Sequence, residues 1–531
     1  DGDIITENHL MKNEYCGIHI SSCNGFVIRE NEVLQIEGKE ARMGIHVVNC
    51  KDGGSVEANL VSKIQGKGIL IWESKGIVSS RNLLKGENEI GISVHRGREN
   101  KFGQNVITSN ANGVELCEVN DTELESNDFS SNKGYGIMFR GDGKEGWKGN
   151  KVLENNIVGN GHGININAPH DPRDTVIVDN LIDGNYIARN ERGIYIEGCK
   201  FLIRNNFVTS SKCGIYISLA DGVVVEKNRV EKNNDGIKLS GNNNEIVENV
   251  LLHNEVSDVW LISGNANLMV DNLIRKECGT RRCVFGIMGG RDNEIKRNEV
   301  LFRRGNGIDM QDCFNSVVRG NVLVSEGFKK ERSEGIKVYK GEAHLITGNL
   351  VAGTRFGISI KQSSLNVIEE NVVAKTDREG VVLLSCKDTL LRGNVIRENK
   401  GGGIRGTSTT GPMVNENEIT SNEAFGITFE GGARVSITGC EVNGNVGDGI
   451  VVYGINDVSV TSSTVLDNLL YGILINSSRM IYMSGNTIAG SLVGNKLRKA
   501  IITGNYVVGK IEMYNVGGKV MGNVEVRSTR H

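Results

Sequence analysis

The stretch Asn228-Arg229-Val230, followed by Asp235-Gly236-Ile237-Lys238-Leu239, decides the fold of this chain. It joins an Asn, an apolar residue two places on, a short turn and a Gly-Ile-x-apolar segment. The unit recurs twenty times, mostly 21 to 24 residues apart, with Asp258 once in the place of the glycine. A fixed period of this size is typical of a solenoid, in which each unit adds one coil to a shared core. The unit glycines are Gly17, Gly44, Gly68, Gly91, Gly113, Gly136, Gly163, Gly193, Gly214, Gly236, Gly286, Gly307, Gly335, Gly357, Gly380, Gly403, Gly426, Gly449 and Gly472.

Each unit predicts three short strands in which apolar residues alternate with polar ones. In one copy these strands are residues 214–217, residues 223–225 and the segment around Val230. With 69 Gly and only 3 Pro in 531 residues, the composition fits tight turns between regular strands. We therefore expect an all-β solenoid of about 20–22 coils that forms a single domain over residues 1–531.

An Asn recurs in nearly every unit, and Cys440 and Ser463 interrupt the series. Its amide can donate to and accept from neighbouring coils, so we expect a structural asparagine ladder. The predicted ladder is Asn31, Asn59, Asn82, Asn105, Asn127, Asn205, Asn228, Asn249, Asn272, Asn298, Asn321, Asn349, Asn371, Asn394, Asn417, Asn486 and Asn505.

The Asn-x-Val…Gly-Ile-x-Ile repeat resembles the right-handed parallel β-helix of the pectate-lyase-like superfamily, and most of all its NosD/CASH-type repeats. The resemblance covers nearly all of residues 8–523. It implies a carbohydrate-active protein in an extracellular or cell-surface location. The net charge of −3 gives no reason to expect a nucleic-acid partner, and no apolar run predicts membrane insertion.

Four interruptions of the repeat predict loops that frame a groove, beyond a further one at residues 35–43. Loops on a rigid scaffold commonly carry function. Two of the four follow a Gly-led strand and two precede one, so they would wall one strand column from both sides. The four are residues 140–149, 167–174, 275–285 and 325–334.

The floor of this groove would be the outward residue of each Gly-led strand. The sequence predicts Met138, Asn165, Tyr195, Tyr216, Lys238, Trp260, Met288, Asp309 and Lys337 in this column. Aromatic residues make up only 5% of the chain, so their clustering here favours stacking against sugar rings. Alternatively, the rings pack on one another and stabilise the sheet.

Cationic residues gather beside this column and suit an anionic, uronic-acid-type polysaccharide as the partner. They are Arg275, Lys276, Arg281, Arg282, Arg303, Arg304, Lys329, Lys330, Arg332, Lys337 and Lys340. The candidate substrate-binding residues are Asn165, Tyr195, Tyr216, Trp260, Arg282 and Arg304. An alternative for the same charges is an ordinary solvated loop.

His162-Gly163-Ile164-Asn165 with Pro169-His170 is similar to the Tyr-Gly-Phe-Asp-Pro-His motif of mannuronan epimerases. Asn165 stands at the position of that family's catalytic Asp, and His162 stands at its Tyr. A lyase or epimerase needs a base for the C5 proton, and the candidate catalytic residues are Lys238, His170, Asp309 and Lys337. No zinc spacing is present, whereas Asp171, Asp174 and Asp179 are candidate Ca²⁺ ligands.

Two other functions stay open beside a polysaccharide-binding lyase or epimerase. One is a structural or adhesive rod that assembles, as a homo-oligomer, through uncapped ends. The other is an intracellular CASH-type scaffold, which unpaired cysteines would allow. The 11 Cys form no complete disulfide framework, although Cys23 and Cys50 are close enough in the predicted stack to pair.

Overall fold

The structure is a computed structural model that describes residues 2–38, 42–141, 147–168, 178–198, 200–277, 283–326 and 333–526. The chain divides into two compact units, Asp1–Val259 and Trp260–His531. The regular secondary structure of the described residues is entirely β-strand. Among these residues, no helical segment has the length and apolarity needed to span a bilayer. A single domain over residues 1–531 stays a prediction.

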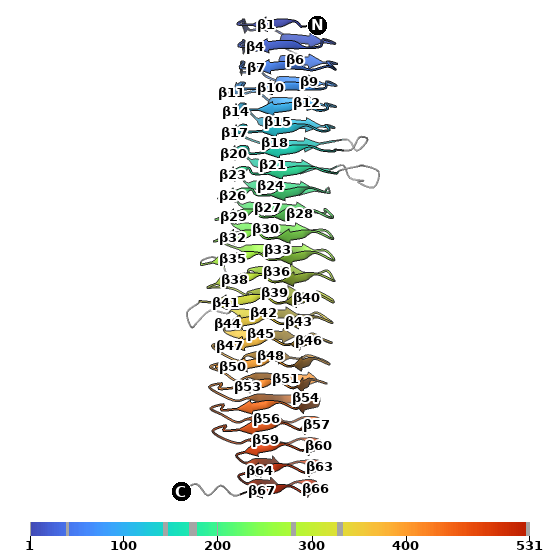
Figure 1. Cartoon of the computed structure of the whole chain (residues 1–531), viewed down its shortest axis with the longest axis vertical. Helices are drawn as coiled ribbons and strands as arrows, with labels where there is room; N and C mark the ends of the chain where they lie inside the picture. Colours follow the sequence, from blue (N-terminus) through green and yellow to red (C-terminus); the bar gives the residue numbers. More distant parts are fainter. Residues whose placement is uncertain are drawn as a thin grey trace. The chain divides into compact units, whose positions relative to one another are not determined.

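One coil of the first unit consists of β27 (Cys213–Ser218), β28 (Val224–Glu226) and β29 (Arg229–Glu231). These are the three strands predicted from the repeat. Each pairs in parallel with the matching strand of the next coil, so that Ile215 lies opposite Ile237 and Val230 lies opposite Leu251. Figure 1 shows such coils stacked in chain order within the unit. Stacking in register buries the inward side chains of all three strands in one continuous core.

The Gly-led strands of the first unit carry the surface that matters below. They are β3 (Cys16–Ser21), β6 (Met43–Val48), β9 (Lys67–Trp72), β12 (Ile90–His95), β15 (Asn112–Cys117), β18 (Tyr135–Arg140), β21 (His162–Asn167), β24 (Arg192–Glu197), β27 and β30 (Asp235–Ser240). Glycine is required near their starts because the next coil approaches closely. A Cβ atom on Gly214 would lie 2.7 Å from the carbonyl oxygen of Gly236.

The asparagine ladder joins coil to coil inside the turn before the third strand. The backbone N–H of Asn228 donates to Oδ1 of Asn249 at 2.9 Å, and its Nδ2 donates to the carbonyls of Ile203 and Glu226, each at 2.9 Å. The residue before each ladder position adopts a left-handed conformation, as Lys227 does with φ 53°. The ladder therefore satisfies buried turn backbone, as the sequence predicts.

One predicted ladder position was wrong. Asn205 has the left-handed conformation (φ 53°), and Asn206 is the buried ladder residue that donates to Oδ1 of Asn228 at 2.9 Å. A second ladder, which was not predicted from the sequence, lies five residues after the first within the same coil. In it the N–H of Asn233 donates to Oδ1 of Asn254 at 3.1 Å.

The second unit repeats this construction in its own coils. Its Gly-led strands include β36 (Phe285–Met288), β39 (Ile308–Gln311), β42 (Glu334–Tyr339) and β45 (Phe356–Lys361). Cys440 replaces a ladder Asn, and its thiol donates to the carbonyl of Val414 at 3.3 Å. The coils of both units together make about 21 solenoid turns. All nine described cysteines are free thiols, including Cys23 and Cys50.

Candidate functional site

The predicted outward column exists in the first unit. Met138, Asn165, Tyr195, Tyr216 and Lys238 are successive in-register neighbours on β18, β21, β24, β27 and β30. Because adjacent parallel strands lie about 4.8 Å apart, these side chains form one continuous row.

Arg192 and two tyrosines form the centre of this row. The Arg192 guanidinium carbon lies 4.6 Å from the ring centre of Tyr195 and 5.5 Å from that of Tyr216. The two rings are 5.4 Å apart and tilted by 58°. The Tyr195 hydroxyl donates to Oε2 of Glu197 at 2.8 Å, and burial raises the pKa of this phenol. The rings thus pack on each other, and none of the described carboxylates pairs with Arg192.

Strand β21 carries polar groups that the described protein does not satisfy. Asn165 is only 4% exposed and lies between Met138 and Tyr195 in the row. Nδ1 of His162 and Oδ1 of Asn167 are buried without a hydrogen-bond partner among the described residues. Burial and the nearby Arg192 lower the pKa of His162, so its ring is neutral at neutral pH. An unsatisfied buried polar group costs about 1–3 kcal/mol, which a ligand can recover.

Lys238 is held in an ion pair. Its Nζ lies 2.5 Å from Oδ2 of Asp235, whose Oδ1 accepts a hydrogen bond from the Ser257 hydroxyl at 2.8 Å. The amino group is therefore committed to a carboxylate in this arrangement. Its assignment as a catalytic base stays a prediction.

In the second unit, Asp309 and Lys337 form a similar pair. Nζ of Lys337 donates to both carboxylate oxygens of Asp309, at 3.0 and 3.1 Å. Asn306 and Gln311 donate to the same carboxylate at 2.8 and 3.2 Å, and Asp309 is 8% exposed. Three side chains thus donate four hydrogen bonds to one acidic group, which makes this cluster a closed network rather than an open acid–base pair.

The register of β36 differs from the prediction. Gly286, and not Met288, lies opposite Asp309, while Met288 lies opposite Gln311. The Trp260 ring occupies the space over Gly286, because a Cβ atom there would lie 2.1 Å from Cε3 of the ring. Glycine is needed at this outward position to admit the indole, which explains the shift.

Several predicted site residues lie outside the described part of the chain. These are His170 and Arg282, together with most of the four predicted groove loops. Arg304 is described and exposed. The prediction that Lys276 belongs to an exposed basic wall was wrong. This lysine lies on β35 (Leu273–Lys276) and is only 1% exposed. Trp147, from the loop at 140–149, is likewise buried, with its ring centre 6.1 Å from that of Phe139.

For metals, the described residues contain no group of three or more His, Cys, Asp or Glu side chains placed to bind an ion. Of the predicted Ca²⁺ ligands, Asp171 and Asp174 lie outside the described residues. A pair of histidines is nevertheless close together, with Nδ1 of His19 lying 3.1 Å from Nδ1 of His46.

A cleft that was not predicted from the sequence lies over β6 and β9, at the N-terminal end of the same outward face. It has a volume of about 600 Å³ and is lined by Tyr15, Arg42, Met43, His46, Val48, Gln65, Gly66, Lys67, Leu70, Trp72 and Glu89. Arg42 comes from the interruption at residues 35–43. That interruption was the only signal in the sequence for a cleft at this place.

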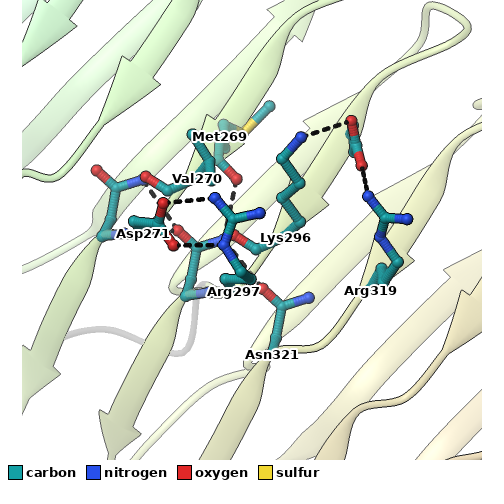
Figure 2. A network of polar contacts seen from close by, with 10 residues as sticks. Met269, Val270, Asp271, Lys296, Arg297, Arg319 and Asn321 are labelled. Carbon is teal, nitrogen blue, oxygen red and sulfur yellow. Dashed lines mark hydrogen bonds and ion pairs between the residues drawn. The ribbon is translucent and has the colours of Figure 1, made fainter.

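Elsewhere on the surface, outward charges are commonly neutralised between adjacent coils. Figure 2 shows such a group in the second unit, where Arg297 donates to both carboxylate oxygens of Asp271, at 2.6 and 2.8 Å. In the same view Lys296 and Arg319 pair with one carboxylate, that of Glu294, at 3.3 and 3.0 Å. A cation without such a partner therefore stands out on this surface.

The sequence profile of the right handed beta helix region matches residues 143–286 and 356–505, which is more than half of the chain. The chain belongs to the right-handed β-helix family. A second profile, described as periplasmic copper-binding protein (NosD), matches residues 1–171 of this β-helix protein. The comparison with curated proteins finds no match.

Solved structures similar to this β-helix protein share little sequence with it. The AlgE4 A-module of mannuronan C-5 epimerase from Azotobacter vinelandii is 15% identical, covering 63% of this chain and 90% of its own, with a TM-score of 0.31. The periplasmic alginate epimerase AlgG is 12% identical, with 64% and 85% coverage and a TM-score of 0.29. A double mutant of the tailspike protein of E. coli bacteriophage HK620 is 10% identical, with 63% and 71% coverage and a TM-score of 0.39.

Proposed function

We propose that the outward face of β18 to β27 binds an anionic, uronic-acid-type polysaccharide in an extracellular or periplasmic setting. The observation that carries the proposal is a pair of buried polar atoms on β21, Nδ1 of His162 and Oδ1 of Asn167, which have no hydrogen-bond partner among the described residues. Sugar hydroxyls both donate and accept hydrogen bonds, so they can satisfy these two atoms and also contact the amide of Asn165, which lies between Met138 and Tyr195 in the same row.

Arg192 supplies the charge that selects an anionic sugar. Its planar guanidinium can take a carboxylate in a bidentate manner while it stays stacked on Tyr195. The exposed parts of the Tyr195 and Tyr216 rings provide apolar surface for a sugar ring. Because the row repeats from coil to coil, it suits a polymer of repeating sugars better than a single small molecule.

Binding is the function that these groups support best. Asn165 is an amide, which cannot act as the acid of an epimerase, and Lys238 is engaged by Asp235. A lyase or epimerase activity would need a base from another group, such as His170. Release of unsaturated uronate from the bound polymer would reveal a lyase, and a changed ratio of the two C5 epimers in the intact polymer would reveal an epimerase.

The test measures affinity for polygalacturonate, alginate and neutral dextran by calorimetry. Wild type should bind the two polyuronates and not dextran. Asn165→Ala and Arg192→Gln should each weaken polyuronate binding at least tenfold. The matched controls Asn156→Ala and Arg204→Gln change exposed or ion-paired residues on β20 (Asn156–Val158) and β25 (Leu202–Arg204) and should leave affinity unchanged.

Absence of polyuronate binding by wild type, or equal effects of test and control variants, would contradict the proposal. Ordered assemblies in electron microscopy that do not respond to polyuronate would instead favour a structural rod.

A second candidate function, copper binding, rests on the His19–His46 pair. Two ligands about 2.0 Å from one metal ion lie roughly 3 Å apart, which the 3.1 Å separation of the two Nδ1 atoms matches. Burial, His19 and Lys67 lower the pKa of His46 to about 4, so its ring is neutral at neutral pH and has one nitrogen without a proton that can bind a metal. The NosD profile, described as copper-binding, includes both residues. Imidazole is a good ligand for copper, and bound copper would supply redox or metal-transfer chemistry.

Competition titration with a chromogenic Cu(I) chelator tests this second function. His19→Gln and His46→Gln should each lower copper affinity at least tenfold. His9→Gln, which changes an exposed histidine paired with Glu32, is the control. Unchanged affinity in both test variants would exclude the pair as a copper site.

A further inference from the structure

The cleft over β6 and β9 combines an apolar floor with two cations. Met43 and Leu70 form part of the floor and are 3% and 6% exposed. Arg42 and Lys67 line the same space. A volume of about 600 Å³ lies within the range of sites for small organic ligands.

Neither cation has a carboxylate partner among the described residues. Arg42 is held instead by neutral oxygens: its Nε donates to the carbonyl of Gly38, and its Nη1 donates to the side-chain and backbone oxygens of Gln65. Glu89 lines the cleft without forming an ion pair with either cation. Arg42 is thus fixed in place with its charge uncompensated.

Lys67 is fixed in a comparable way by a neutral imidazole. Its Nζ lies 3.3 Å from Nε2 of His95. Burial and the neighbouring cations lower the pKa of His95 to about 4, so at neutral pH the ring accepts a hydrogen bond from Lys67 and leaves its positive charge intact. In contrast, Arg81 and Arg96 in the same part of the unit both pair with glutamates.

An indole provides the third element of the cleft. The Trp72 ring stacks on the His95 ring at 5.0 Å, with an angle of 16° between the ring planes. One indole face therefore lies against His95, and Trp72 also lines the cleft. A flat ring in the cleft can stack on this indole while an attached anion reaches Arg42 and Lys67.

A buried polar cluster separates this cleft from the face of β18 to β27. The Ser93 hydroxyl donates to Oε2 of Glu115 at 3.2 Å, and Arg140 forms an ion pair with the other oxygen of Glu115. Ser93 and Glu115 are 0% and 5% exposed, so this stretch of the outward column offers no open surface. The two surfaces are therefore distinct.

From this geometry we propose that the cleft is a binding site for a small carboxylate with a flat, apolar ring body. The carboxylate contacts Arg42 and Lys67, and the ring lies between Trp72 and the Met43–Leu70 floor. This site is independent of the proposed polysaccharide face.

The experiment titrates the full chain with 2-naphthoate by calorimetry at neutral pH, with EDTA present so that the histidine pair holds no metal. The neutral analogue 2-naphthylmethanol and the sugar acid galacturonate are titrated in parallel. We expect 2-naphthoate to bind with a micromolar Kd and both other compounds to bind at least tenfold more weakly. Arg42→Gln, Lys67→Met and Trp72→Leu should each raise the Kd for 2-naphthoate at least tenfold.

Arg81→Gln and Asn165→Ala are the controls and should leave the Kd for 2-naphthoate unchanged. Arg81 is an exposed arginine outside the cleft, and Asn165 belongs to the polysaccharide face. Thermal unfolding of each cleft variant confirms that it is folded, and Lys67→Gln replaces Lys67→Met if the latter is unfolded.

No binding of 2-naphthoate up to millimolar concentration, or equal binding by cleft variants and controls, would overturn the proposal. Tighter binding of galacturonate than of 2-naphthoate would overturn the proposal of an apolar ring and would indicate a sugar acid as the ligand. Loss of polyuronate binding without loss of 2-naphthoate binding would affect only the polysaccharide proposal.

Discussion

At the residue scale, two adjacent asparagines have opposite roles. Asn206 is buried and exchanges hydrogen bonds with Asn185 and Asn228, whereas Asn205 occupies the exposed left-handed position and donates to Asp183. The sequence repeat does not show which of the two is the ladder residue, because asparagine fits both the ladder position and the left-handed position. Their burial does.

Asn206→Ala should lower the free energy of unfolding by about 3 kcal/mol or more, because it leaves several buried backbone and side-chain groups unpaired. Asn205→Gly should change it by less than about 1 kcal/mol, because glycine adopts φ 53° without strain. Urea denaturation measures both. A larger effect at Asn205 would mean that the ladder assignment is wrong.

His344 is a residue-scale source of acid sensitivity. It is 1% exposed, and its Nδ1 accepts a hydrogen bond from the backbone N–H of Ser316 at 3.3 Å. Burial lowers its pKa to about 4. A proton on Nδ1 would face that N–H, so the folded protein disfavours the charged ring while the unfolded chain accepts it.

The unfolded state therefore binds more protons as the pH falls from about 6.5 to about 4, and stability declines over this window. His344→Asn should remove about 2 kcal/mol of this loss at pH 5. Urea denaturation at pH 5 and pH 7.5 compares the variant with wild type. Equal pH dependence of the two proteins would refute the assignment.

At the element scale, the pairing of β36 depends on one glycine. Gly286 lies opposite Asp309 and beneath the Trp260 ring. The repeat indicates that Gly286 starts an ordinary unit, but the indole requires the outward position itself to lack a side chain.

Gly286→Ala should destabilise the protein by about 1–3 kcal/mol and shift its tryptophan fluorescence, because the methyl group displaces the indole. In the Trp260→Leu background, where the indole is gone, Gly286→Ala should cost much less unfolding free energy than it does in wild type. Calorimetric unfolding and emission spectra provide the readouts. Additive effects in the double variant would argue against the contact.

At the scale of the whole molecule, charge is local. The net charge of −3 does not attract a polyanion, whereas Arg192, Arg42 and Lys67 lack carboxylate partners among the described residues. Binding of an anion must then rely on short-range contacts with these cations.

Polyuronate affinity should fall at least tenfold when NaCl rises from about 0.05 M to about 0.5 M, because salt screens the contacts of partly exposed cations. Arg192→Gln should show a smaller salt dependence than wild type. Calorimetry at several salt concentrations measures both slopes. An affinity that does not respond to salt would point to a neutral ligand.

The sequence by itself determined the coil. The spacing of the glycines, the alternation of strands such as Gly214–Ile217 and the recurring Asn predict the parallel β-helix and its ladder, because each depends on contacts that repeat with the period of the sequence. It also placed Asn165, Tyr195 and Tyr216 in one row. The second ladder was not predicted, although Asn233 follows Asn228 by five residues and repeats with the same period.

Only the tertiary structure decided which outward cations form ion pairs and which have no carboxylate partner among the described residues. Lys238 and Lys337 are both outward lysines, and the structure pairs each with an aspartate, while it leaves Arg42 and Arg192 without described carboxylates. Only in the structure does Gly286 lie under the Trp260 ring, and only there does a cleft open over β6 and β9. These outcomes depend on side chains brought together from other coils, about 20 to 30 residues away along the chain, where the repeat fixes the backbone but not the side-chain partners.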